Sequence, residues 1–179
     1  MTRSGPLRRI VAAFTPQKVG GPAAPLEELS YVQGEPITLG KGKVSIVEFW
    51  ATWCPPCKVA IPHLNKLYVE KYKKAGVQLV GVTKEDEKTV KPFIESMKSS
   101  FTYPVALDSS GSVSSGYPTN GIPSAFVVDH EGSVAWQGHP MDGGFETAVD
   151  TCIENAKATK GSGDKKVADK KEAGDKKVD

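Results

Sequence analysis

The segment EFWATWCPPCKVAIP, residues 48–62, joins a buried strand to a helix and carries two cysteines at the junction. The strand begins upstream, because VSIVEFW (44–50) is a mostly apolar run of β-branched and aromatic residues, the pattern of a strand buried on both faces. After the cysteines, apolar residues recur at three- and four-residue steps up to an Ala-Gly pair, which predicts a helix over 55–74. Cys54 and Cys57 are therefore expected where the helix begins.

Two cysteines separated by two residues at a strand-to-helix junction are the arrangement expected of a redox-active dithiol. Cys54 is expected at the helix start, where free amide groups and the helix dipole stabilise a thiolate. Cys57 follows one turn later, close enough to close a small disulfide ring with Cys54. Pro55 and Pro56 have no amide hydrogen, fit the first helical turn and stiffen that ring.

Half of a zinc site and two cysteines of the core are the alternative interpretations of the pair. Zinc needs a second pair of ligands. The other candidates, Cys152 and the three histidines, show no ligand spacing, so we expect neither a metal nor another cofactor. Cys152 lies alone on one face of a predicted helix, and we expect it to be a buried core thiol rather than a third redox centre.

Outward from this segment the chain alternates between strand and helix patterns. A second buried strand is predicted over 77–82, and a second helix begins near Asp86 or, if Pro92 lies in its first turn, at Thr89. The stretches 124–129 and 133–138 predict an antiparallel hairpin, and a last helix is predicted over 144–158. The order predicts an α/β sandwich with a mixed sheet flanked by helices.

Composition limits the classes of function. The 179 residues carry 23 Lys+Arg against 21 Asp+Glu, but residues 27–158 hold 12 basic and 16 acidic ones, so the folded part offers no basic surface for nucleic acid. No apolar stretch approaches the roughly 18 residues of a membrane span. We expect a flexible leader over 1–29, a redox domain over 30–158, and a disordered tail rich in Lys and Asp over 159–179.

The sequence of the predicted leader indicates in which cellular compartment the protein is expected. Its apolar run, residues 10–14, is shorter than the roughly 7–15 residues of a secretory signal, and three cysteines do not suggest a secreted disulfide framework. The arginines and the lack of acidic residues over 1–26 also fit a weak mitochondrial presequence. A cytoplasmic location is the expectation, with a mitochondrial one as the alternative.

The residues around the dithiol resemble those of thioredoxin-fold proteins, and the resemblance spans about residues 30–157. Pro62 matches the position at which these proteins kink the active-site helix, and GIPS (121–124) is similar to the loop that carries their cis-proline. Glu48 matches their buried carboxylate, with Glu in place of the usual Asp. The long segment 85–117 resembles the insertion of the redoxin branch, which includes TlpA-like reductases, tryparedoxins and nucleoredoxins.

This resemblance implies a mechanism. Cys54 attacks a substrate disulfide as a thiolate and forms a mixed disulfide, which Cys57 resolves. Glu48 is expected beneath Cys57, where burial raises its pKa and lets it carry the Cys57 proton directly or through water. A satisfied strand carboxylate with no catalytic part is the alternative for Glu48.

The resemblance also implies a substrate-binding surface. Pro123 is expected to be cis, and the Ile122 backbone is expected to pair with an extended substrate segment. Trp53 is expected to shield the dithiol, with an ordinary exposed aromatic as the alternative, and Trp53, Pro55 and Pro56 are expected to contact the substrate.

The predicted function is reduction of protein or small-molecule disulfides by a thiol-disulfide oxidoreductase, supplied with electrons by a thioredoxin reductase or a glutathione-like thiol. Ala60 stands where many TlpA-like reductases have Glu, which argues against a periplasmic role in cytochrome maturation. The alternatives are a thiol peroxidase, although Thr52 lies two rather than three residues before Cys54, and a redox-sensing module that binds a partner. A monomer is expected.

Overall fold

The centre of the fold is a short strand, β2 (Ser45–Phe49), whose five residues are all buried in this computed structural model. The structure describes residues 19–172. In that range β2 pairs in parallel with β3 (Gln78–Thr83) and antiparallel with β5 (Ser124–Val128), so it lies inside a mixed sheet. Burial on both faces explains its nearly continuous apolar sequence.

The described residues form a six-stranded sheet with the strand order β1-β4-β3-β2-β5-β6. The remaining strands are β1 (Ser30–Gln33), β4 (Val105–Leu107) and β6 (Val134–Gly138). β3 and β4 run parallel, whereas β1 and β6 pair antiparallel at the two edges. The hairpin predicted from residues 124–138 is confirmed as β5 and β6.

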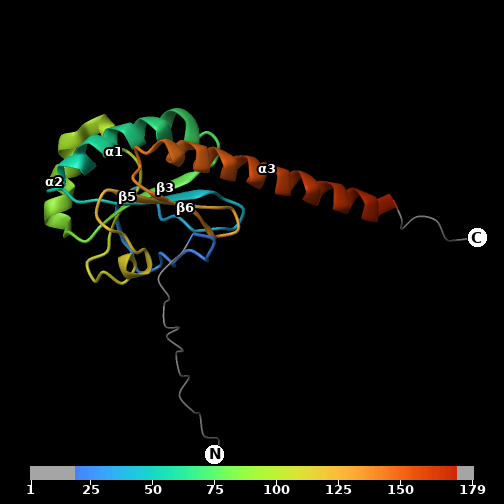
Figure 1. The fold of residues 1–179 in the computed structure, drawn as a ribbon, viewed down its shortest axis with the longest axis horizontal. Coiled ribbons are helices and arrows are strands. Elements are labelled where there is room, and N and C mark those ends of the chain that lie inside the picture. Colours follow the sequence, from blue (N-terminus) through green and yellow to red (C-terminus); the bar gives the residue numbers. More distant parts are fainter. Residues whose placement is uncertain (1–18, 173–179) are drawn as a thin grey trace, which may run out of the picture.

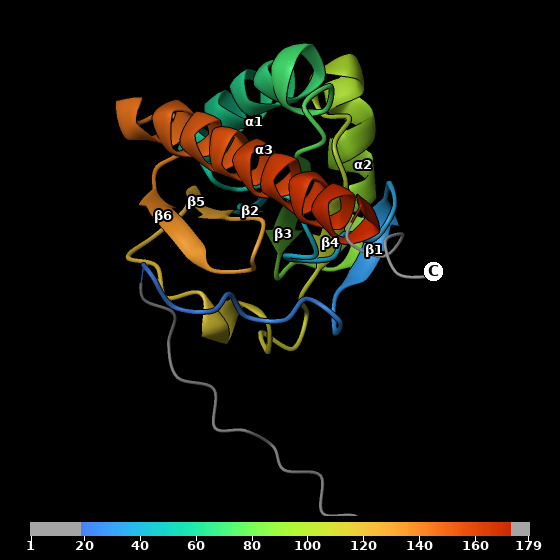
Figure 2. The same cartoon turned by 90° about the vertical axis from the view of Figure 1, so that its right-hand side faces the viewer.

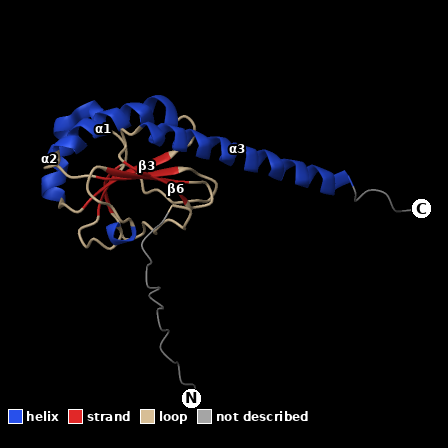
Figure 3. Ribbon diagram, viewed as in Figure 1, coloured by secondary structure: helices blue, strands red, loops and turns tan. Residues whose placement is uncertain are grey.

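One face of this sheet is covered by α-helices, namely α1 (Pro55–Leu67), α2 (Glu87–Met97) and α3 (Gly143–Glu172) (Figure 1). Figures 2 and 3 show that extended segments and a short helical turn cover the opposite face. That turn is η3 (Ser114–Gly116). The prediction of an α/β fold with a mixed sheet and flanking helices is confirmed, and within residues 19–172 the face opposite the α-helices is covered by irregular segments and η3.

The helical stretch predicted over 55–74 is α1 followed by a π-helical turn, η1 (Tyr68–Tyr72), and it contains Pro62. Of the two expected starts of the second helix, the one near Asp86 is confirmed. Asp86 is the N-cap of α2, and its side chain accepts a hydrogen bond from the Thr89 amide. Pro92 therefore lies inside α2. A 3-10 turn, η2 (Lys98–Ser100), follows α2.

The structure differs from the sequence-based prediction at both ends of the domain. Ala24 and Leu26 are buried against the sheet, and the Gly20 amide donates to the Val134 carbonyl at 2.8 Å, so the leader predicted over 1–29 is too long. Residues 1–18 lie outside the described range. At the other end α3 runs to Glu172 instead of ending at 158, since Lys, Ala and Glu are good helix formers. Of the predicted tail, 173–179 lie outside the described range.

None of the helices in residues 19–172 has the length and apolar character that crossing a membrane requires.

Candidate active site

The two cysteines of the CPPC segment form a disulfide, with their Cα atoms 5.2 Å apart. Cys54 is the N-cap of α1, and its Sγ accepts a hydrogen bond from the Cys57 amide at 3.2 Å. Both side chains are buried. An amide that points at Sγ from the first turn of a helix stabilises a thiolate at Cys54 once the disulfide is reduced.

The residues around the disulfide explain why α1 begins there. Pro55 and Pro56 occupy the first two helical positions, where an amide hydrogen has no partner within the helix. Both are exposed, as is Trp53, which keeps 69% of its surface accessible. A partner can therefore contact all three, whereas the disulfide itself is buried.

A second loop approaches the disulfide from β5. The Ile122–Pro123 peptide bond is cis, as expected, and the Ile122 carbonyl oxygen lies 3.6 Å from Cys54 Sγ. Pro123 is buried and Ile122 is half-buried. The structure thus brings together the two segments that the sequence identified separately.

Glu48 is the fourth of the five residues of β2, and its side chain is completely buried. Because side chains alternate along a strand, Glu48 shares a face with Ile46 and Trp50, the face that α1 and Cys57 cover. Burial raises the pKa of Glu48 from 4.5 to about 7, and a hydrogen bond from Tyr103 partly opposes that rise. The predicted burial and raised pKa are confirmed, whereas proton transfer by Glu48 stays a prediction.

Tyr103 was not identified in the sequence. Its hydroxyl donates to Glu48 Oε2 at 2.9 Å, and Tyr103 is itself completely buried. Nothing in the local pattern around residue 103 marks it as a partner of a carboxylate 55 positions earlier.

Glu85 is a second residue that sequence reasoning missed. Its carboxylate accepts hydrogen bonds from the Thr52 amide at 2.7 Å and from the Thr52 hydroxyl at 2.6 Å. The Thr83 hydroxyl also donates to it, at 3.3 Å. Glu85 therefore ties the loop that precedes Cys54 to the end of β3.

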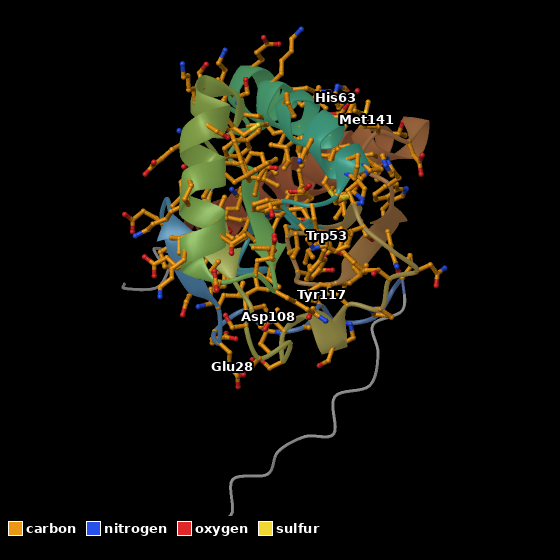
Figure 4. The ribbon with its side chains drawn as sticks, turned by 90° about the vertical axis from the view of Figure 1, so that its left-hand side faces the viewer. Glu28, Trp53, His63, Asp108, Tyr117 and Met141 are labelled. Atoms are coloured by element: carbon orange, nitrogen blue, oxygen red, sulfur yellow. A yellow bond between two sulfur atoms is a disulfide. The ribbon has the colours of Figure 1, made fainter. Side chains whose placement is uncertain are left out.

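A cavity of about 680 Å³ opens beside the disulfide. Three segments line it: the loop after β2, which includes Trp53; the end of β3, with Lys84; and the stretch 114–122, which ends at Ile122. Figure 4 shows Trp53 between α1 and the lower segments of the molecule. Cys54 does not line this cavity itself, but its chain neighbour Trp53 and the residue that contacts its Sγ, Ile122, both do.

Cys152 is buried in α3, as expected. Burial and the nearby Asp129 carboxylate raise the pKa of its thiol to about 11. A thiol with that pKa is a poor nucleophile at neutral pH. Within residues 19–172 no cluster of three or more His, Cys, Asp or Glu side chains is arranged to hold a metal ion.

Comparison with known proteins agrees with a redox-active Cys54–Cys57 pair. The AhpC/TSA family pattern matches residues 21–137. The thiol-disulfide oxidoreductase ResA of Bacillus thuringiensis subsp. konkukian is 35% identical over 117 residues, which cover 64% of this chain and 66% of ResA. The sporulation thiol-disulfide oxidoreductase A of Bacillus subtilis is 33% identical over 108 residues, covering 58% of this chain and 64% of that protein.

Solved structures agree with these sequence matches. StoA from Bacillus subtilis superposes with a TM-score of 0.54 at 30% identity and covers 62% of this chain and 84% of StoA. A thio-disulfide isomerase from Thermus thermophilus superposes with a TM-score of 0.58 at 27% identity, covering 78% of this chain and 96% of the isomerase. The chain spans about two thirds of the length of the curated relatives it matches.

Proposed function

The chain belongs to the AhpC/TSA family, and on that premise we propose that it is a thiol-disulfide oxidoreductase that reduces disulfides at Cys54 and Cys57. One observation carries the proposal: the two cysteines form a disulfide at the N-terminus of α1, with the Cys57 amide directed at Cys54 Sγ. The names of its relatives, thiol-disulfide oxidoreductases, support it.

The reaction needs only the two thiols and a substrate disulfide. The Cys54 thiolate attacks one substrate sulfur, forms a mixed disulfide and releases the other sulfur as a thiolate. Cys57 then loses its proton and attacks Cys54 Sγ, which forms the Cys54–Cys57 disulfide and releases the second substrate sulfur. Two electrons pass from the dithiol to the substrate, which leaves as two thiols.

Glu48 takes up the Cys57 proton in this proposal. A carboxyl with a pKa of about 7 is poised to accept a proton at neutral pH and to return it. Its place under α1, on the face of β2 that Cys57 covers, supports this assignment.

We propose disulfide-containing proteins as the substrates. The cavity beside the disulfide supports this, because it can hold an extended segment next to Trp53 and Ile122. An upstream thioredoxin reductase or a glutathione-like thiol would return electrons to Cys54–Cys57. The monomeric state and the cytoplasmic location stay predictions.

Reduction of insulin disulfides, coupled to dithiothreitol, tests the function. Cys54→Ser should abolish the activity, Cys57→Ser should accumulate a mixed disulfide with the substrate, and Cys152→Ser should behave as the wild type. If Cys54→Ser retains the wild-type rate, the proposal fails. Hydrogen peroxide in place of insulin tests the peroxidase alternative, which requires rapid peroxide consumption by reduced Cys54.

The reduction potential of Cys54–Cys57 against glutathione tests the direction of electron flow. A potential well below that of the glutathione pool is expected for a reductase. A potential well above it would mark an oxidant or isomerase and would contradict the cytoplasmic location.

A further inference from the structure

The hydrogen bond between Tyr103 and Glu48 joins two completely buried side chains that lie 55 positions apart in the chain. Tyr103 lies two residues before β4, whereas Glu48 lies on β2. In the strand order, β3 lies between β4 and β2. The phenol ring must pass over β3 to reach the carboxylate.

Gly81 makes that crossing possible. It is the β3 partner of Glu48, and a Cβ atom at position 81 would lie 3.1 Å from the Tyr103 ring and 3.0 Å from Trp50 Nε1. Both contacts are tighter than side chains tolerate without moving. On the other side of β2 the partner of Glu48 is Ala125, another small residue. The sheet therefore leaves room for the Glu48–Tyr103 pair on this face.

The position of Tyr103 is fixed by its surroundings. Its ring packs edge-on against Phe101 at 4.8 Å between centroids and against Tyr68 at 6.4 Å. The Gln33 amide group donates to the Tyr103 carbonyl at 2.8 Å, which also fixes the backbone. The hydroxyl is thus held in place before any reaction begins.

This geometry decides which carboxyl oxygen carries the proton. Burial and the nearby Glu48 hold the pKa of Tyr103 well above its ordinary value of 10, so the phenol stays protonated and donates to Oε2. In a neutral carboxylic acid the oxygen that accepts is the carbonyl, so the acid proton resides on Oε1. The reverse arrangement would leave the phenol hydrogen without an acceptor in the described part of the chain. Oε1 itself has no hydrogen-bond partner among the described residues.

We propose that Tyr103 is a positioning residue of the dithiol reaction, which orients Glu48 so that Oε1 exchanges the proton of Cys57. The inference rests on the proposed disulfide reduction. In the resolving step the Cys57 thiol gives its proton to Oε1, its sulfur attacks Cys54 Sγ, and the substrate thiolate departs. Tyr103 keeps its own proton throughout.

No other titratable group on this face is among the causes that act on the pKa of Glu48 in the described range. The elements that pack on this face contribute Cys57 from α1, Tyr68 and Tyr72 from η1, and Cys152 from α3. In the described range, burial and the Tyr103 hydrogen bond are the causes that act on the pKa of Glu48. When the phenol hydroxyl is removed, burial is the remaining cause, and the pKa of Glu48 rises further.

The test follows the oxidation of reduced protein by oxidised glutathione through tryptophan fluorescence. Mixed-disulfide formation depends on the glutathione concentration, whereas resolution by Cys57 does not, so the second phase reports the proton transfer. In the wild type its rate should rise with pH around a midpoint near 7. Tyr103→Phe should move that midpoint up by about one pH unit and slow resolution about tenfold at pH 6.

Tyr31→Phe is the matched control. It also deletes a single phenol hydroxyl that takes part in a hydrogen bond, which it accepts from the Ile37 amide at 3.2 Å, but it lies on the opposite face of the sheet and away from the cavity beside Trp53. Its midpoint should equal that of the wild type. In a Glu48→Gln background the midpoint near 7 should disappear, and Tyr103→Phe should then produce no further shift. An equal shift in Tyr31→Phe, or none in Tyr103→Phe, overturns the proposal.

A second variant decides the matter if Tyr103→Phe does not fold. 3-Fluorotyrosine at position 103 keeps the ring and strengthens the phenol as a donor, so it should lower the midpoint. An unchanged or raised midpoint contradicts the proposal. If the wild type itself shows no resolution phase and reduces no disulfide, the proposed function fails instead, and that result is obtained before any Tyr103 variant is made.

Discussion

Replacing Glu48 by Gln should change the stability of the fold in a pH-dependent way. Glu48 has a pKa of about 7 in the folded protein and an ordinary value of 4.5, so between these values the folded state holds a proton that the unfolded state has released. The free energy of unfolding therefore falls as the pH rises from 4.5 through 7 and reaches its full loss above 7. The difference of 2.5 between the two values corresponds to about 3 kcal/mol. Gln keeps the size and the hydrogen-bond acceptor but has no charge to bury.

Urea unfolding of the disulfide form, monitored by the fluorescence of the buried Trp50, measures this loss. The stability of Glu48→Gln minus that of the wild type should grow by about 3 kcal/mol between pH 4 and pH 9. Glu70→Gln, which removes one carboxylate from the exposed surface of η1, controls for the change in net charge. A difference between Glu48→Gln and the wild type that stays constant over this range refutes a raised pKa for Glu48.

Other changes separate positioning from packing. Glu85→Ala should cost about 1–3 kcal/mol in urea unfolding and lower the rate of insulin reduction, because it removes both acceptors of Thr52; unchanged stability would contradict this. Gly81→Ala should cost about 1–3 kcal/mol, since the new methyl group meets the Tyr103 ring; calorimetry measures the loss, and a neutral result would show that the ring moves freely. In the reduced, folded protein at pH 8, iodoacetamide should leave Cys152 unmodified, because its thiol has a pKa of about 11; peptide mass spectrometry detects any alkylation there.

The parts of the fold that the sequence predicted are those with strong local patterns. β2, β3, α1 and the β5–β6 hairpin have continuous apolar runs or helical periodicity, and each is found where it was expected. β1 was missed because its four residues, SYVQ, of which one is exposed and three are half-buried, carry no such run. Its pairing with β4 depends on contacts between segments more than 70 positions apart, which no local window contains.

In the candidate site, too, the residues that belong to short sequence motifs were predicted and the others were not. Cys54, Cys57 and the cis bond before Pro123 follow from short motifs, and the structure brings them together. Glu48 was recognised because it matches the buried carboxylate of thioredoxin-fold proteins. Tyr103 and Glu85 were not recognised, since a tyrosine and a glutamate in an inserted segment are ordinary until the fold places them against residues of the active-site unit.

The features around Glu48 are difficult to explain by stability. A carboxyl group in a central strand is costly to bury, a buried phenol needs a partner, and a glycine in a strand interior weakens the sheet. Well-packed apolar residues at these positions would stabilise the fold at least as well. The three features support one another, however, because Gly81 admits the Tyr103 ring and the ring hydroxyl reaches Glu48. Sequences depart from local rules in this concerted way at functional sites, which favours a reaction role for the pair over a structural one.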